Sequence, residues 1–186
     1  MKKNPITIGF DDAQFKLKSG SNTTQLIGVI CQGIRMVNVV KTEILIDGNN
    51  ATAKLIELVK KNKKYVQIII THSITFGGFN IINLKQIYEE LNKPIIAIND
   101  RKVDLNGVKE ALRKKFSSEY REKIQYIINA GNLYHSEIKT AGGVSKVYFH
   151  SKGVDVSYIE SLLPKICIDS KFPECIRLAH LIGTLF

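Results

Sequence analysis

The sequence predicts an α/β fold, a mixed β-sheet with helices on both faces. The first 46 residues contain three strand-like apolar segments without a helical period. From residue 51 onward, segments with helical apolar spacing alternate with short, continuous apolar runs, as in parallel strands joined by helices. Strands joined by hairpins and followed by such an alternation give a sheet that is partly antiparallel and partly parallel.

The first three strands are expected at residues 5–10, 24–31 and 37–46. Residues 5–10 alternate, and the other two segments are rich in Val and Ile, which favour strands. Gln32 and Gly33 stand at the place of a hairpin turn between them. A three-stranded antiparallel meander is therefore predicted.

Two βαβ units are expected next. Apolar residues recur at helical spacing within residues 51–59 and 84–91. The continuous apolar runs at residues 66–70 and 94–98 follow these helices and are typical of buried parallel strands.

The C-terminal part is expected to be mainly helical. Helices are predicted at residues 108–116, 119–129 and 157–163, the last ending before Pro164, with a short strand at 146–150.

A final helix is expected to begin at Pro173, because proline fits the first helical position and Glu174 complements the helix dipole. Arg177 and His180 fall on one flank, where they can reach a cleft. The predicted buried stripe consists of Leu178, Leu181, Ile182 and Leu185.

Composition favours one domain covering residues 1–186, since 186 residues with 44% hydrophobic content can build an ordinary core. No run of eighteen apolar residues and no signal-peptide pattern occurs, so we expect a cytoplasmic protein without a membrane partner. Cys31, Cys167 and Cys175 form no metal or disulfide pattern and are expected to be inert thiols.

The net charge of +10 favours a polyanionic partner, in practice DNA or RNA. Much of the excess lies in Lys60, Lys61, Lys63 and Lys64 and in residues 113–115. These clusters are equally typical of solvated helix ends. Oligomeric state does not follow from the sequence.

Five stretches spread along the chain form a set: residues 9–13, 46–52, 74–80, 93–96 and 172–180. The last, Phe-Pro-Glu-Cys-Ile-Arg-Leu-Ala-His, resembles the closing Pro-Glu-x-x-Arg-x-Ala motif of endonuclease V, with His180 in the slot of a metal-binding aspartate. The chain as a whole resembles an uncharacterised archaeal family of endonuclease V homologues. This resemblance implies a ribonuclease H-like fold, to which the predicted mixed sheet corresponds.

The resemblance also implies site residues. Gly9-Phe10-Asp11 matches a magnesium-binding Gly-x-Asp, and only one of the adjacent Asp11 and Asp12 can face the site. Asp11 is the predicted one, although a turn cap is an alternative role. His72 stands where the family has a second essential carboxylate, and Asp100 where it has a lysine.

Asp47 follows a predicted strand, at a place where ligand-facing groups occur in α/β sheets. It either faces a ligand or belongs to an Asp-Gly turn before a helix capped by Asn50 or Thr52. The predicted catalytic residues are Asp11, Asp47 and His180, and the predicted metal ligands are Asp11, Asp47, His72 and His180.

The expected cofactor is a divalent metal. Mg²⁺ or Mn²⁺ is implied by the resemblance, while a set of two histidines and one carboxylate suits zinc, manganese or iron better than magnesium. Alternatively, the histidines are hydrogen-bonded or act as general acid and base.

The Gly- and Phe-rich stretch at residues 74–80 is predicted to contact nucleic acid through stacking and exposed N–H groups. The alternative is a loop that packs its phenylalanines in the core. The predicted nucleic-acid contacts are Phe76, Gly77, Gly78, Phe79, Asn80, Lys102 and Arg177.

Two functions are compatible with this sequence. The first is a nucleic-acid-binding, divalent-metal-dependent endonuclease that acts on inosine-containing DNA or RNA, the substrate implied by the resemblance. The second is a non-catalytic module with a degenerate nuclease site that binds nucleic acid, a nucleotide or a protein.

Overall fold

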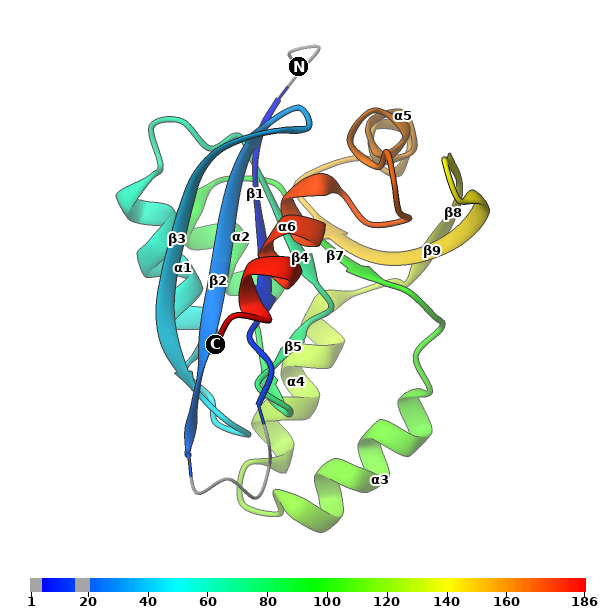
Figure 1. The fold of residues 1–186 in the computed structure, drawn as a ribbon. Coiled ribbons are helices and arrows are strands. Elements are labelled where there is room, and N and C mark those ends of the chain that lie inside the picture. The colour runs from blue at the N-terminus through cyan, green and yellow to red at the C-terminus, as the bar shows by residue number, and fades with distance from the viewer. Residues whose placement is uncertain (1–4, 16–20) are drawn as a thin grey trace.

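The computed structural model describes residues 5–15 and 21–186 (Figure 1). A seven-stranded sheet has the strand order β3-β2-β1-β4-β7-β9-β8, and β5 and β6 form a separate two-stranded ribbon. The strands are β1 (Ile6–Asp12), β2 (Thr23–Gln32), β3 (Arg35–Leu45), β4 (Ile68–His72), β5 (Thr75–Phe76), β6 (Asn80–Ile81), β7 (Ile95–Asn99), β8 (Tyr134–Thr140) and β9 (Gly143–Lys152).

The strand pairing confirms the predicted mixed sheet. β1, β2 and β3 form an antiparallel meander. β4 runs parallel to β1, and β7 runs parallel to β4. β9 and β8 complete the sheet as an antiparallel hairpin. Because β1, β4 and β7 are parallel, their carboxyl ends lie at the same edge of the sheet, and these ends bear Asp11, His72 and Asn99.

Helices cover both faces of the sheet, as predicted (Figure 1). One core lies between the sheet and α1, α2 and α4, and the other lies between the sheet and α5 and α6. Among the described residues, no helix is long and apolar enough to cross a bilayer. The helices are α1 (Ala51–Lys61), α2 (Leu84–Leu91), α3 (Leu105–Lys115), α4 (Tyr120–Ala130), α5 (Val156–Ile166) and α6 (Glu174–Gly183).

Three strands were not predicted. β8 has one fully buried apolar residue, Ile138, so it lacks the apolar run that identified the other strands. β5 and β6 contain two residues each; β5 lies within residues 74–80, for which a loop was the alternative, and β6 begins at the end of that segment. The prediction that a helix ends before Pro164 is also wrong. α5 continues through Pro164 to Ile166. The burial of the Ile166 side chain offsets the loss of the helical hydrogen bond that proline cannot make.

The buried face of α6 differs from the predicted stripe. Leu181 and Leu185 are exposed, whereas Leu178 and Ile182 are partly buried and pack against the core, as predicted. Cys175 lies on the most buried face because α6 packs closely on β1, where a Cβ atom at Gly9 would lie 2.5 Å from the carbonyl carbon of Cys175. Pro173 is the N-cap rather than the first helical residue. The buried residues are Glu174, Cys175, Ile176, Ala179 and Gly183.

The three cysteines are buried free thiols. Burial raises the pKa of Cys31 to about 11 and that of Cys175 to about 12. Burial also raises the pKa of Cys167. Thiols that stay protonated at neutral pH are poor nucleophiles, as expected from their spacing in the sequence.

Candidate functional site

The carboxyl end of β1 places an aspartate between two histidines. Asp11 shares a sheet face with Gly9, because side chains alternate along a strand. Gly9 lets α6 approach this face closely, which brings His180 to Asp11. β4 lies parallel to β1 and contributes His72 from its own carboxyl end.

Each oxygen of Asp11 contacts one imidazole. Nδ1 of His72 lies 3.0 Å from Oδ1, and Nδ1 of His180 lies 2.9 Å from Oδ2. The backbone N–H of Asp12 also donates to Oδ1, at 3.0 Å. Asp11 is 3% exposed, while the side chains of His72 and His180 are 34% and 57% exposed. A buried carboxylate therefore holds two imidazoles that solvent can reach.

This geometry fixes the tautomers of the histidines. A carboxylate only accepts hydrogen bonds, so each Nδ1 carries a proton and donates it to Asp11. Each Nε2 is then free to give or take a proton. Burial would lower the pKa of His72, but the hydrogen bond to Asp11 and the charges of Asp11, Asp12 and Asp100 outweigh burial and raise it above 6.5. The arrangement can perform general acid–base chemistry.

Asp12 faces the opposite side of β1, as expected for the neighbour of Asp11. Its Oδ2 accepts a hydrogen bond from the backbone N–H of Gly77 at 3.0 Å. Burial raises the pKa of Asp12, the hydrogen bond from Gly77 opposes this rise, and the nearby charge of Asp11 adds to it. Asp12 thus holds the segment between β5 and β6 against β1.

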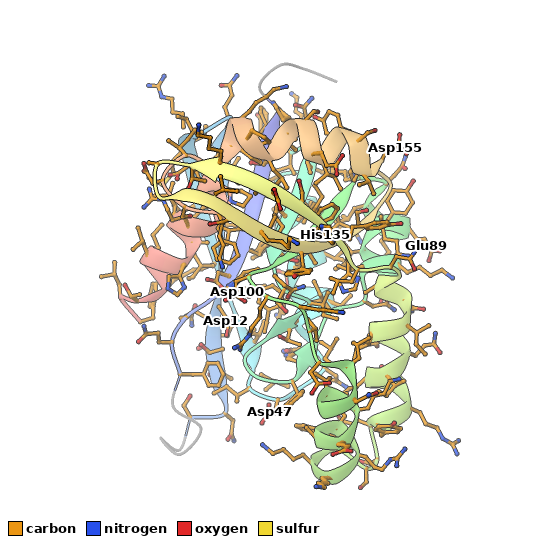
Figure 2. All side chains as sticks on the ribbon, turned by 90° about the vertical axis from the view of Figure 1, so that its right-hand side faces the viewer. Asp12, Asp47, Glu89, Asp100, His135 and Asp155 are labelled. Atoms are coloured by element: carbon orange, nitrogen blue, oxygen red, sulfur yellow. The ribbon has the colours of Figure 1, made fainter. Side chains whose placement is uncertain are left out.

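Asp47 is placed away from the two histidines and fixes the same segment. Its Oδ1 accepts from the backbone N–H of Phe79 at 2.8 Å, and its own N–H donates to Gly77 O at 2.7 Å. A Cβ atom at Gly78 would lie 2.3 Å from Asp47 Oδ1, which explains why glycine stands there. In Figure 2, Asp47 lies well below Asp12 and Asp100. The Asp47 carboxylate thus has a structural role in this segment, which was the alternative to facing a ligand.

Asn50 is the N-cap residue of α1, but its side chain makes no capping bond. Asn80 Oδ1 accepts from the N–H of Ala51 at 3.0 Å instead. Thr52 accepts from the N–H of Asn83 at 2.9 Å. The predicted caps therefore tie the start of α1 to β6 and α2.

Three predicted nucleic-acid contacts, Phe76, Gly77 and Asn80, are corrected by their burial. Phe76 is 1% exposed and belongs to the same core as the buried residues of α1 and α2, so neither ring face is open to a base. Asn80 is fully buried and is bonded to the start of α1. Gly77 is buried, and its N–H is bonded to Asp12. Gly78 and Phe79 are half-buried, and both line a cleft.

The predicted cations differ in their partners. Arg177 makes two hydrogen bonds to the buried Glu174, at 2.7 and 2.8 Å. Lys102 is exposed and lines the cleft, next to Arg101. Asp100, in the slot of the family's lysine, lies 4.0 Å from the Arg101 guanidinium.

The four predicted metal ligands are not assembled into one site. In the part of the chain that the structure describes, no three His, Cys, Asp or Glu side chains are grouped so that they could hold an ion. The hydrogen bonds explain this, because both Asp11 oxygens already face an imidazole Nδ1. Mg²⁺ prefers several oxygen ligands, and this donor set does not fit it. Asp11 is instead placed as an orienting group for two histidines.

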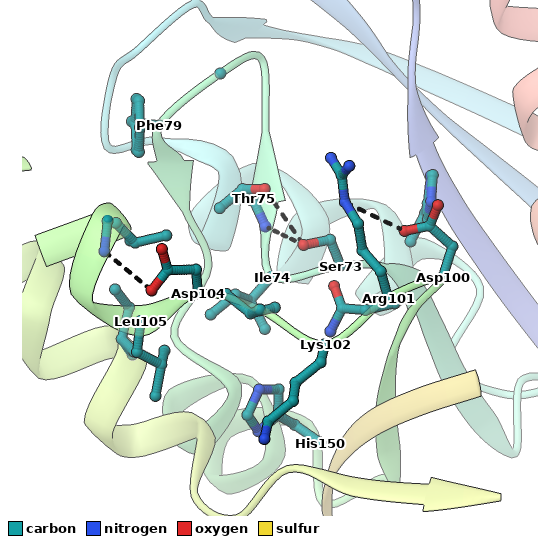
Figure 3. A pocket seen from close by; sticks show the side chains of 17 residues that line it. Ser73, Ile74, Thr75, Phe79, Asp100, Arg101, Lys102, Asp104, Leu105 and His150 are labelled. Carbon is teal, nitrogen blue, oxygen red and sulfur yellow. Dashed lines mark hydrogen bonds and ion pairs between the residues drawn. The ribbon is translucent and has the colours of Figure 1, made fainter. Parts of the chain in front are cut away.

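A cleft of about 850 Å³ opens next to His72 (Figure 3). It extends past Ser73 and Asn99 to His150 on β9, and α3 lies along its side. Ile74, Val108 and Ile127 provide apolar walls. Clefts of this size, with apolar walls and a few polar groups, are typical small-molecule or base-binding sites.

Sequence reasoning missed Asn99, Lys123 and His150. Asn99 directly follows the predicted buried strand 94–98 and ends β7, at the sheet edge where ligands usually bind, and this position was an available signal. Lys123 is 1% exposed and donates to Gly48 O at 2.6 Å and to Phe79 O at 2.8 Å. No motif surrounds Lys123 or His150, so only the structure identifies them.

Comparison with solved structures confirms the fold class. A protein of unknown function from Archaeoglobus fulgidus superposes with a TM-score of 0.82 at 26% identity, covering 96% of each chain. Endonuclease V from Bacillus subtilis gives 0.61 at 13% identity, covering 96% of this chain and 78% of that one. Ciona intestinalis endonuclease V, solved with a DNA that contains inosine, gives 0.58 at 12% identity, covering 95% and 83%. The fold is thus that of endonuclease V, which is ribonuclease H-like.

Sequence comparison identifies the family. A UPF0215 protein of Methanocaldococcus jannaschii is 34% identical over 188 residues, covering 100% of this chain and 96% of that protein. A UPF0215 protein of Pyrococcus horikoshii is 31% identical over 186 residues, covering 99% and 93%. The model of one family matches residues 5–186. The chain therefore belongs to the family described as Endonuclease dU, whose archaeal UPF0215 members are its relatives and whose fold is that of endonuclease V.

Proposed function

We propose that this protein is an endonuclease that cuts DNA or RNA near a deaminated base. The family description names deoxyuridine, and a structural neighbour was solved with inosine-containing DNA. Uracil and hypoxanthine are the deaminated forms of cytosine and adenine, so both names indicate the same chemical class. The net charge of +10 favours such a polyanionic substrate.

The observation that carries this proposal is the pair of imidazoles held by Asp11. In the proposed reaction, one histidine Nε2 takes a proton from water as the water oxygen bonds to phosphorus. The other histidine, in its protonated form, gives a proton to the leaving oxygen as the P–O bond breaks. General acid–base groups of this kind contribute about 10²- to 10⁴-fold in rate. Asp11 is the positioning residue, since it holds both rings through Nδ1.

Contacts to the nucleic-acid strand are proposed for Gly78, Phe79, Lys102 and Arg177. The Phe79 ring is half-buried at the cleft and can stack on a base, and Lys102 can meet a phosphate. Arg177 lies one helical turn before His180, so the N–H groups that do not bind Glu174 can reach a phosphate held near His180.

A divalent metal remains part of the test. Metal ions commonly assist phosphodiester cleavage by stabilising charge on the phosphate oxygens. The experiment therefore compares EDTA, Mg²⁺ and Mn²⁺, so that the metal requirement is measured directly.

The test uses labelled single-stranded and duplex DNA and RNA, each with one deoxyuridine or inosine, at low salt. Asp11→Asn keeps the size of the side chain but removes its charge, so the imidazoles lose their orientation. We expect cleavage to fall at least about 100-fold in Asp11→Asn. His135→Gln, on the exposed strand β8, is the matched control and should cleave normally. Equal cleavage by Asp11→Asn and the unaltered protein would contradict the proposed centre.

A second candidate function is a non-catalytic module that binds nucleic acid. The observation in its favour is that the predicted metal ligands are not assembled, since Asp47 is bonded to the Gly77–Phe79 backbone. In that case the unaltered protein binds the labelled strands but cuts none of them under any of the three metal conditions.

A further inference from the structure

β3 is an edge strand of the seven-stranded sheet, and its outer side is open. It pairs with β2 on one side only, and Figure 1 shows it at the margin of the sheet. Every second residue of an edge strand directs its N–H and C=O away from the sheet, so this eleven-residue strand is a template for a further strand. Proteins usually block such an edge or pair it.

The pairing with β2 identifies the residues that face the free edge. The N–H of Ile46, directly after β3, donates to Asn22 O at 2.9 Å. Residues of an antiparallel pair alternate between facing the partner and facing away, so the even-numbered residues of this segment bond to β2. The odd-numbered residues from Val39 to Leu45 therefore direct their N–H and C=O groups outward.

Side chains block the two ends of this outward-facing segment. The N–H of Val39 donates to Asn38 Oδ1 at 2.9 Å, and the N–H of Leu45 donates to Asn50 Oδ1 at 3.0 Å. Neither N–H bonds to β2, which agrees with the alternation. The edge that remains open consists of the residues between Val39 and Leu45.

Lys41 and Glu43 are the outward-facing residues of this open edge. Within residues 5–15 and 21–186, their backbone N–H groups have no hydrogen-bond partner. Both side chains are exposed. Lys41 lies over the Phe186 ring, at 4.2 Å from its centroid, and Glu43 accepts from the side-chain amide of Gln25 at 3.3 Å. These uncharged partners leave both charges available to another molecule.

The open segment is complementary to itself. When a second copy pairs with it in the antiparallel sense, with Thr42 opposite Thr42 on a twofold axis, Lys41 of each copy lies opposite Glu43 of the other. In the same register Val39 lies opposite Leu45, and these side chains are 39% and 41% exposed. Opposite charges and apolar side chains that face each other across two strands stabilise the pairing.

Other registers are less favourable. A shift of two residues places Lys41 opposite Lys41 or Glu43 opposite Glu43, and like charges in this position are destabilising. A shift of one residue places outward-facing groups opposite groups that already bond to β2, so the hydrogen bonds are lost. Only the register with Thr42 on the axis lets Lys41 and Glu43 exchange both backbone hydrogen bonds.

We propose that β3 is a dimerisation surface, at which two copies of this chain join their sheets edge to edge. The contact is isologous, as in most homodimers, and it closes after two copies. β2 and β1 lie between β3 and β4, whose carboxyl end bears His72, so the dimer leaves the candidate site open. This inference is therefore independent of the proposed cleavage.

The experiment is sedimentation velocity of the full chain over an about hundredfold range of concentration. We expect the unaltered protein to pass from monomer to dimer, because a small edge contact gives a weak and reversible association. Lys41→Glu places two glutamates opposite each other on both sides of the axis, so association should weaken at least about tenfold. The matched control is Lys139→Glu on β8, the other edge strand, which should associate normally.

A charge exchange tests the register itself. Glu43→Lys alone should weaken association as Lys41→Glu does, since it places lysines opposite each other. An equal mixture of the two variants restores opposite charges at both pairs, so a heterodimer should form. A variant that was merely misfolded would not be rescued by mixing. In the unaltered protein, amide hydrogen exchange at Lys41 and Glu43 should slow as the concentration rises.

Three results would overturn this proposal: an unaltered protein that stays monomeric over the whole range, a dimer that Lys41→Glu leaves intact, or a mixture of the two variants that stays monomeric. Weaker association in Lys139→Glu alone would place the contact on β8 and also overturn it. Strand cleavage, measured on the same proteins, should not change in any of the variants. A failure of the dimer thus leaves the proposed endonuclease standing, and a failure of cleavage leaves the dimer standing.

Discussion

Asp11 shows how a single side chain can organise this site. It is buried, and its carboxylate receives three hydrogen bonds, one from the backbone and two from histidine rings. A buried carboxylate needs such partners, because desolvation without them is costly. The partners are themselves accessible to solvent, so Asp11 positions groups that can act on a ligand.

The two buried or half-buried histidines should have opposite effects on stability as pH changes. His72 has a raised pKa, so its contribution is fully present below its unfolded pKa near 6.5 and is lost as pH rises through the folded value. His150 has a lowered pKa, so its contribution is present above 6.5 and is lost as pH falls through the folded value.

Urea unfolding at pH 5.5 and pH 8 checks this prediction with His72→Gln and His150→Gln. Relative to the unaltered protein, His72→Gln should be more destabilised at pH 5.5, and His150→Gln should be more destabilised at pH 8. His135→Gln is the control and should shift neither value. If the two variants changed in the same direction with pH, the assigned protonation states would be wrong.

At the scale of elements, the buried cation Lys123 joins α4 to two loops, one between β3 and α1 and the other between β5 and β6. Lys123 donates to the carbonyls of Gly48 and Phe79 and lies 3.2 Å from Glu119. Lys123→Met leaves these carbonyls buried without a donor, so we expect the free energy of unfolding to fall by about 2–5 kcal/mol. Lys114→Met, on the exposed face of α3, should change it by less than about 0.5 kcal/mol. Equal urea midpoints for the two variants would show that the buried contacts are not stabilising.

The packing of α6 on β1 depends on Gly9. Gly9→Ala places a Cβ atom against the Cys175 backbone, so α6 must shift and carry His180 away from Asp11. We expect a loss of about 1–3 kcal/mol in unfolding free energy and a larger relative loss of strand cleavage. Gly142→Ala is the control, because its Cβ atom would lie 3.7 Å from Thr140 Oγ1, an ordinary contact distance. This variant should preserve both the unfolding free energy and the cleavage. Normal cleavage by Gly9→Ala would contradict the coupling between this helix and the site.

Strong local patterns allowed most elements to be predicted from the sequence. The meander and both βαβ units were recognised because their apolar periods are long and uninterrupted. β8 was missed because its pairing with β9 is satisfied by backbone bonds, while most of its side chains face solvent. The stripe on α6 was correct for Leu178 and Ile182 but wrong for Leu181 and Leu185. Close backbone contact at Gly9 turns Cys175 toward the sheet, and such a tertiary effect has no period in the sequence.

The site could be predicted only in part, for a related reason. Asp11, His72 and His180 come from three separate segments, and a family motif marked their places. Asp47 stood in an equally suggestive stretch, yet its carboxylate is bonded to the backbone of a neighbouring loop. A motif indicates which residues are special but does not say whether a carboxylate faces a ligand or its own chain.

At the scale of the whole molecule, two pairs of basic residues lie on different surfaces, and one of these pairs lines the cleft. Lys60 and Lys61 lie at the end of α1, where Glu90 and Glu57 lie within 3.0 and 2.8 Å of them. Arg101 and Lys102 line the cleft together with residues of α3. In Figure 1, α3 lies on the other side of the molecule from α1. If a nucleic-acid strand follows the cleft, Arg101 and Lys102 neutralise its phosphates, whereas Lys60 and Lys61 do not.

Salt dependence of binding separates these two surfaces. Each phosphate contact to a single strand contributes about 0.7 to the slope of log K against log salt. The double variant Arg101→Ala/Lys102→Ala should therefore lower the slope by about 1.4 and weaken binding at low salt. Lys60→Ala/Lys61→Ala removes the same charge, from +10 to +8, and is the matched control. We expect this control to keep the slope of the unaltered protein. If both variants lowered the slope equally, the protein would attract the strand by its net charge alone, and the cleft would not be the path of the strand.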